Sequence, residues 1–294
     1  MDRSRSLKAL LLAALGFTTA CSAPATGSQE DMAADPLMQR YVAWQDANAL
    51  PAIRLEEAGA PGERKDGSRI GGPVWLPQGE AWPTGSDGKP LSFVAQVDFA
   101  AMPPLPDYPT SGVLQFFIGR DDYYGANFEK PEAGNFKVIF RESMDGAGRF
   151  ETGPVGEAKY DDYSPLFAET ITRGVALKAA AKPEAHKPSL DSWLFNRDLG
   201  DAFEDPSTHP VYDAIADQSR DWGYGVYIGG HPEFTQSDWR ETPEYNDVDR
   251  VLLQLWTQDD HLMWGDSGQG QFTIRREDLL KKDFSKVFYQ WDCY

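Results

Sequence analysis

The stretch IGGPVWLPQGEAWP, residues 70–83, has an echo late in the chain, IGGHPEFTQSDWRETP at residues 228–243. Both contain Ile-Gly-Gly, a proline, an aromatic residue, a glutamine and a tryptophan. Each is followed by an apolar run that includes a glutamine, SFVAQVD in the first case and VLLQLWTQDD in the second. This pattern predicts two half-repeats, about 68–158 and 224–294, with a helical insert between them.

A half-repeat rarely folds alone when its sheet continues into its twin, so we expect one domain over residues 35–294. Its predicted class is α+β, with a mixed, largely antiparallel sheet. Apolar, β-branched and aromatic runs between Gly or Pro clusters predict strands at 52–57, 69–77, 90–99, 111–119, 135–143, 225–230, 250–256, 261–264, 271–275 and 286–292. Helices are predicted at 35–50, 190–203 and 209–223, with a short one at 276–282.

The composition limits the classes of partner. The formal net charge is -18, and 41% of the 294 residues are hydrophobic. Excess negative charge opposes phosphate backbones and anionic lipid headgroups, so nucleic-acid binding is not expected. A basic protein or peptide partner is compatible with this charge.

The N-terminal sequence has the three-part pattern of an export signal over residues 1–20. Three basic residues precede an apolar run from Ala9 to Phe17, and small residues follow it. TTAC, residues 18–21, resembles a bacterial lipobox, which predicts lipidation at Cys21 and a flexible tether over 21–34. We therefore expect an exported protein with a lipid anchor in a bacterial membrane, on the periplasmic face of the outer membrane. The alternative is a plain signal peptide with an unmodified cysteine. If Cys21 carries lipid, Cys293 has no partner for a disulfide within the chain.

The tetrad Gly-Asp-Ser-Gly at 265–268 matches the surroundings of the nucleophile in trypsin-like proteases. Such a serine needs an imidazole base and an orienting aspartate. None of the four histidines lies in the sequence context that this family uses. Glycines around Asp266 and Ser267 suit a hairpin turn, and we expect the serine to be a turn residue.

Acidic pairs are the remaining candidates for metal binding. Asp259 with Asp260, and Asp121 with Asp122, could offer oxygens to calcium, but neither pair has the spacing of an EF-hand loop. Acid pairs beside strands are usually solvated turns. We expect no cofactor.

Tryptophans in polar loops are the best candidates for ligand binding. Trp82 and Trp239 lie among Pro, Glu, Asp and Arg, where a role in the core is less obvious. With Trp75 and Arg240, these loops could form a groove for a peptide or a glycan. Core packing is the alternative for each of these aromatic residues.

Taken in order, the motifs SRIGGPVWLP, GVLQFFIG, IGGHPEFTQSDWR, MWGDSGQGQFTI and DFSKVFYQWDC resemble the YwqG-like family of bacterial domains, from about Ser68 to the C-terminus. The resemblance implies an α+β domain with duplicated sheet halves. It also implies that Gly-Asp-Ser-Gly belongs to the fold and not to a protease site.

Three functions remain open at this point. The favoured one is a membrane-anchored, non-catalytic binding module, comparable to an immunity protein that neutralises a basic partner. The first alternative is an envelope hydrolase that uses Ser267 or a carboxylate pair such as Asp259 and Asp266. The second is a structural lipoprotein stabilised by calcium.

Overall fold

The computed structural model describes residues 32–154, 163–218, 225–258 and 260–294. The predicted signal peptide, the lipidation candidate Cys21, most of the predicted tether and the acidic candidate Asp259 lie outside the described residues. No helix in the described part of the chain is long and apolar enough to cross a membrane.

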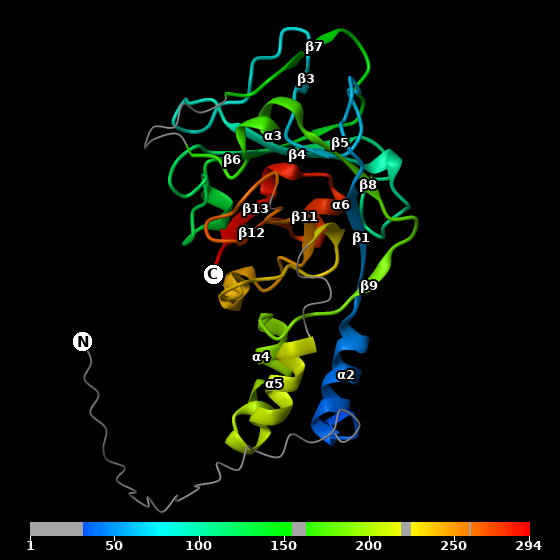
Figure 1. Ribbon diagram of the computed structural model, residues 1–294, viewed down its shortest axis with the longest axis vertical. Helices are drawn as coiled ribbons and strands as arrows, with labels where there is room; N and C mark the ends of the chain where they lie inside the picture. Colours follow the sequence, from blue (N-terminus) through cyan, green and yellow to red (C-terminus); the bar gives the residue numbers. More distant parts are fainter. Residues whose placement is uncertain (1–31, 155–162, 219–224, 259) are drawn as a thin grey trace, which may run out of the picture.

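One large antiparallel sheet dominates the molecule, as the predicted α+β class requires (Figure 1). Its strand order is β13-β12-β11-β10-β1-β8-β2-β4-β5-β6, and β9 also pairs with β1. The strands are β1 (Leu50–Glu57), β2 (Arg69–Ile70), β4 (Ser92–Asp98), β5 (Val113–Ile118), β6 (Phe136–Arg141), β8 (Val175–Ala179), β9 (Glu184–His186), β10 (Val226–Gly229), β11 (Arg250–Trp256), β12 (Gln269–Ile274) and β13 (Phe288–Asp292). All of the described pairings are antiparallel, so the expectation of a mixed sheet was wrong.

The two arms of the sheet extend from its centre in the same manner. At the centre β1 pairs with β8, and Glu56 lies opposite Lys178. On one side β10 to β13 form a meander, and on the other side β2, β4, β5 and β6 form another. The expected helical insert therefore contains two strands of the sheet, β8 and β9, which precede the predicted helices and were not predicted.

The sheet curls until its two arms share one core. Phe116 of β5 packs on Phe272 of β12 with 4.7 Å between ring centroids, and Phe136 of β6 packs on Tyr289 of β13 at 5.4 Å. The main apolar cluster contains side chains from both arms and from β1 and β8. Sheet curvature thus brings the late strands against the early ones, and the sheet is nearly closed.

Three helices form a separate lobe at one end of the molecule (Figure 1). They are α2 (Pro36–Asn48), α4 (Trp193–Leu199) and α5 (His209–Gln218). Asp35 caps α2 by accepting from the backbone N–H of Leu37 at 2.7 Å, as its sequence predicts. The lobe has its own apolar core, to which Tyr41, Phe195 and Ile215 contribute.

A buried polar network joins this lobe to the sheet. Nδ1 of His186 accepts from the backbone N–H of His231 at 2.9 Å, so its Nε2 carries the ring proton and donates to Glu233 at 3.1 Å. Nε2 of His231 donates to the carbonyl of Asn48, the last residue of α2, at 2.7 Å. Burial lowers the pKa of His231 from 6.5 to about 3, so this ring is neutral at pH 7.

Two local predictions need correction. Residues 261–264 do not form a strand, since Leu262 makes only isolated bridges to Leu166 and Gln258. The predicted strand at 69–77 divides at Gly71 and Gly72, after which β3 (Val74–Pro77) leaves the main sheet. It pairs instead with β7 (Gly148–Glu151) in a small two-stranded sheet at the end of the molecule opposite the helices (Figure 1). The short helix α6 (Arg276–Leu280) lies where it was predicted.

Candidate functional site

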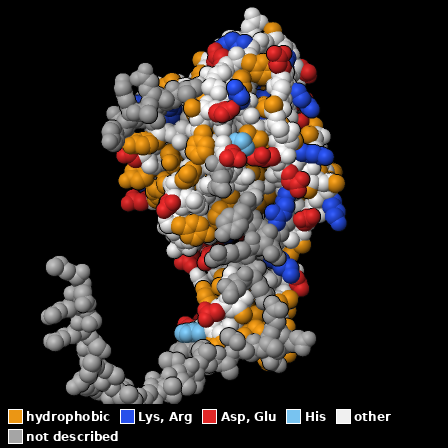
Figure 2. Space-filling view, viewed as in Figure 1, with side chains coloured by type: hydrophobic (Ala, Val, Ile, Leu, Met, Phe, Trp, Pro, Cys, Tyr) orange, Lys and Arg blue, Asp and Glu red, His pale blue; other side chains and the backbone are white. Residues whose placement is uncertain are grey.

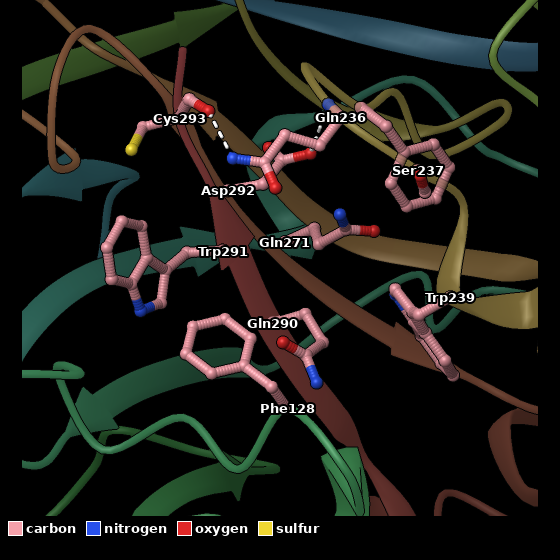
Figure 3. A pocket seen from close by; sticks show the side chains of 10 residues that line it. Phe128, Gln236, Ser237, Trp239, Gln271, Gln290, Trp291, Asp292 and Cys293 are labelled. Atoms are coloured by element: carbon pink, nitrogen blue, oxygen red, sulfur yellow. Dashed lines mark hydrogen bonds between the residues drawn. The ribbon is translucent and has the colours of Figure 1, made fainter.

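A pocket of about 340 Å³ lies beside the last strand, β13 (Figure 3). This volume is within the usual range for small-molecule sites, which begins at about 300 Å³. Aromatic rings and uncharged polar groups form most of its lining, and none of the described lining residues is basic. The lining residues are Phe128, Phe234, Gln236, Ser237, Trp239, Gln271, Gln290, Trp291, Asp292 and Cys293.

Two glutamines lie side by side on the wall formed by β12 and β13. Gln271 and Gln290 are direct cross-strand partners, so their side chains point to the same face of the sheet. Gln290 is held in place because its Nε2 donates to the carbonyl of Asn127 at 2.9 Å. Gln271 is only 1% exposed, and its Oε1 is buried with no hydrogen-bond partner among the described residues. An unpaired buried acceptor costs about 1–3 kcal/mol.

The corresponding glutamine of the other arm is fully satisfied. Gln115 of β5 lies opposite Gln96, just as Gln271 lies opposite Gln254, and both precede a buried phenylalanine. Oε1 of Gln115, however, accepts from Nε of Arg141 at 2.7 Å. At the corresponding place beside Gln271, strand β13 carries Gln290 and Asp292, and neither supplies a cation like Arg141. Gln254, beside Gln271 on β11, also has an unpaired Oε1, so the second arm leaves two of these glutamine acceptors without a described partner whereas the first arm leaves neither.

Trp239 forms the wall facing these glutamines. Trp239 begins the 3-10 helix η5 (Trp239–Glu241). Its ring stacks on that of Phe288, with 5.9 Å between ring centroids, and packs edge-on against Tyr245 at a centroid separation of 5.3 Å. Its indole Nε1 is a second buried polar atom without a described partner. In Figure 3 the carboxamide of Gln271 is directed toward Trp239, whose Nε1 edge is turned toward Gln271. The pocket therefore has an unpaired donor, Trp239 Nε1, opposite an unpaired acceptor, Gln271 Oε1, and Oδ1 of Asp292 is a further buried acceptor without a described partner.

Arg240 supports this wall from behind. It is 1% exposed, and its guanidinium forms a buried ion pair with Asp238 at 2.6 Å. Asp238 also accepts from the backbone N–H of Arg240 and of Trp193, which connects η5 to helix α4. Although predicted as a binding residue, Arg240 does not line the pocket, and in this structure it positions Trp239.

Asp292 holds the loop that forms the rim. Its Oδ2 accepts from the backbone N–H groups of Thr235 and Gln236, at 2.8 and 3.2 Å. Gln236 in turn donates to the carbonyl of Cys293 at 2.6 Å (Figure 3). Burial raises the pKa of the Asp292 carboxyl, and the two backbone hydrogen bonds oppose that rise. Cys293 is a free cysteine that lines the pocket.

Exposed aromatic rings extend from the pocket across the surface. Tyr123 and Phe128 are 61% and 49% exposed, and their ring centroids lie 5.8 Å apart. Phe128 lies 5.8 Å from Trp291, whose Nε1 donates to the carbonyl of Tyr123 at 2.7 Å. Figure 2 shows apolar side chains gathered on the side of the body where the C-terminus lies. We call Tyr123, Phe128 and Trp291 the aromatic row.

The structure does not bring the other predicted tryptophans to this site. Trp82 donates through Nε1 to the carbonyl of Leu91 at 2.8 Å and packs edge-on against Phe117. Trp75 is 2% exposed in β3, below Lys65. Both residues pack within the structure around β3, so the expected shared groove of Trp75, Trp82 and Trp239 is not formed.

Ser267 lies in the predicted turn. It is exposed, with a left-handed backbone (φ 61°), in the turn that leads into β12. The nearest histidine in sequence, His261, pairs with Glu57 at 2.8 Å. Among the described hydrogen bonds none joins Ser267 to a histidine, and Asp266 is an exposed turn residue.

The acidic candidates for metal binding either accept hydrogen bonds within their own loop or are exposed to solvent. Oδ1 of Asp121 accepts from the backbone N–H groups of Tyr123 and Gly125, at 3.0 and 2.9 Å, which shapes its own loop. Asp122 and Asp260 are exposed. Within the described ranges, no three His, Cys, Asp or Glu side chains come together as a metal site would require.

The sequence reasoning missed most of the pocket. Gln271, Gln290, Trp291 and Phe128 were not proposed as binding residues. Gln271 and Gln290 sit in the similar patterns QFT and YQW, which place each glutamine on the face opposite its neighbours. The cross-strand pairing that joins them required the strand register.

Residues 68–293 match the model of a protein family described as a domain of unknown function, DUF1963. No curated protein matches the sequence. The matched region includes the whole pocket and both arms of the sheet, but not helix α2 or strand β1. Because the match covers well over half of the 294 residues, the chain belongs to the DUF1963 family.

Proposed function

We propose that the protein is a non-catalytic binding module that recognises a secondary amide group in the pocket beside β13. The observation that carries this proposal is the pair of buried, unpartnered atoms, Gln271 Oε1 and Trp239 Nε1. A buried polar group is normally hydrogen-bonded, so two such atoms in one pocket favour a ligand that supplies the missing partners.

The chemistry of a trans secondary amide fits this pair. Its N–H and C=O point in opposite directions because the peptide unit is planar. An amide placed between the two walls can donate to Gln271 while it accepts from Trp239. Neighbouring aromatic rings would cover the apolar flanks of the ligand.

We also propose that the sheet consists of two half-repeats, each with an Ile-Gly-Gly strand followed by three longer ones. The glutamine pairs Gln96–Gln115 and Gln254–Gln271 support this proposal, as do matching register shifts in β4 and β11. In the first half Arg141 satisfies Gln115 and binds Glu80 at 2.5 Å. The second half has no equivalent cation, which leaves its glutamine available for a ligand.

Export and lipid anchoring through Cys21 remain part of the proposal. The basic start, the apolar run and TTAC support them. An amide ligand would then be a component of the bacterial envelope. The order of the motifs between Ser68 and Cys293 supports a YwqG-like assignment within the family.

Titration with N-methylacetamide, the simplest secondary amide of this kind, tests the function. The full chain is purified in detergent with ¹⁵N-labelled tryptophan, so its 9 tryptophans give separate indole N–H signals. We expect a saturable shift of the Trp239 signal and no shift of the Trp82 signal, because Trp82 Nε1 is already bonded to Leu91.

The Gln271→Met variant keeps the side-chain length and removes the acceptor. It should lose the saturable shift of Trp239 while the other indole signals keep their positions, which shows that the fold is intact. A Trp239 signal that does not respond to N-methylacetamide in the wild type would contradict the proposed function.

A further inference from the structure

The aromatic row extends the site beyond a single amide. Tyr123, Phe128 and Trp291 follow one another at ring-centroid separations of 5.8 Å, and Phe128 and Trp291 also line the pocket. The hydrogen bond from Trp291 to the Tyr123 carbonyl fixes the two ends of the row relative to each other. Contiguous exposed aromatic side chains of this kind mark a binding surface.

An extended peptide cannot pair with β13 as an additional strand. Although β13 is the last strand of the sheet, the segment around residues 123–134 crosses it. Gln290 bonds to the carbonyl of Asn127, and the hydroxyl of Tyr289 donates to the carbonyl of Tyr124 at 3.2 Å. Strand addition requires an open edge, so the backbone ladder that usually gives a peptide its affinity is not available here.

The charge of the site also restricts its ligand. The described lining residues include no lysine or arginine, and the one ionisable carboxyl is that of Asp292. An anionic ligand would meet no compensating charge in the pocket. Gln236, Ser237 and Gln290 instead offer uncharged hydrogen-bonding groups, which suit hydroxyls.

We infer that the ligand is a glycan of N-acetylated amino sugars, whose acetamido group enters between Gln271 and Trp239 and whose sugar rings lie on Trp291, Phe128 and Tyr123. A pyranose ring has C–H groups on its faces and hydroxyls around its rim, so it can stack on aromatic rings while it bonds to the polar lining. The inference rests on the proposed function, because it assigns the recognised amide to this sugar.

The test compares three probes by the quenching or shift of tryptophan fluorescence in the full chain in detergent. Diacetylchitobiose carries two acetamido groups, cellobiose carries hydroxyls in their place, and N-acetylalanine methylamide carries amides without sugar. We expect diacetylchitobiose to bind at least about tenfold more tightly than either of the others, since cellobiose leaves the buried pair unsatisfied.

Two variants separate the parts of the site. Trp239→Phe keeps an aromatic ring against Tyr245 and Phe288 but lacks Nε1. It should weaken the binding of diacetylchitobiose about tenfold without changing the affinity for cellobiose. Phe128→Ala alters an exposed residue and should weaken both sugars alike. Trp82→Phe is the matched control and should leave every affinity unchanged.

Equal affinities for diacetylchitobiose and cellobiose would overturn the inference, and so would tighter binding of N-acetylalanine methylamide, which would indicate a peptide ligand. If N-methylacetamide shifts the Trp239 signal but neither sugar binds, the glycan inference fails and the proposed function stands. If no amide probe binds at all, both fail.

Discussion

At the scale of single residues, the Gly-Asp-Ser-Gly tetrad is explained by packing. A Cβ at Gly268 would overlap the carbonyl oxygen of Asp292, and one at Gly270 would overlap the indole of Trp264. Gly265 has a φ of 51°, which favours glycine. The tetrad that resembles a protease motif therefore reflects the close approach of one turn to β13 and to a buried tryptophan.

The Gly268→Ala variant should accordingly be destabilised by about 3 kcal/mol, because the turn or β13 must move. Its control is Gly200→Ala, where the added Cβ meets only Asn196 at 4.0 Å and the backbone is helical. We expect that control to change stability by less than about 1 kcal/mol. Urea unfolding of both variants measures the difference, and a Gly268→Ala protein as stable as the wild type would refute the packing explanation.

At the scale of elements, the network of His186, His231 and Glu233 connects the helical lobe to the sheet. The lowered pKa of His231 makes this connection sensitive to acid. The folded protein leaves this ring neutral down to about pH 3, whereas the unfolded chain takes up a proton near pH 6.5. The contribution of the neutral His231 ring to folding stability is fully present above pH 6.5 and decreases as the pH falls toward 3.

We expect His231 to reduce the free energy of unfolding by about 1.4 kcal/mol for each pH unit below 6.5. In His231→Gln, which retains a donor for the carbonyl of Asn48, the dependence on pH should be flatter by that amount. Equilibrium unfolding between pH 7 and pH 4 gives the slope. The exposed His209→Gln serves as the control, and equal slopes in His231→Gln and the wild type would contradict the assignment.

Much of the element content could be predicted from the sequence. Helix α2 has a capping aspartate and a first-turn proline, and long strands such as β4 and β11 are continuous apolar runs, so local signals were sufficient. Strand β8 was not predicted because Val175–Ala179 is a short run of only 5 residues. The pocket could not be predicted for a different reason. Strand register and loop packing bring Gln271 and Trp239 together, and their spacing in the chain gives no sign of this.

At the scale of the whole molecule, closure of the sheet unites the two arms. The contact between Phe116 and Phe272 joins residues that are 156 positions apart in sequence (272 − 116), and no local pattern predicts it. The aromatic row and the pocket depend on the same closure, because residues 123–128 come from the first arm and β13 from the second. The site exists only once both arms are folded.

Membrane anchoring belongs to this scale as well. We expect the wild-type chain, expressed in a bacterium supplied with an alkyne fatty acid, to incorporate the label and to sediment with membranes. Cys21→Ser should lose both properties, while Cys293→Ser should keep them. Equal labelling of wild type and Cys21→Ser would show that the lipid anchor is assigned to the wrong residue.

The comparison of N-methylacetamide with N,N-dimethylacetamide tests the central claim most directly. The two probes are similar in size and carry the same carbonyl, but only the first has an N–H to donate to Gln271 Oε1. The account predicts that the secondary amide shifts the Trp239 indole signal with a Kd at least about tenfold lower than the tertiary one. Equal Kd values would mean that the buried oxygen of Gln271 is not the recognition group, and the proposed site would be wrong.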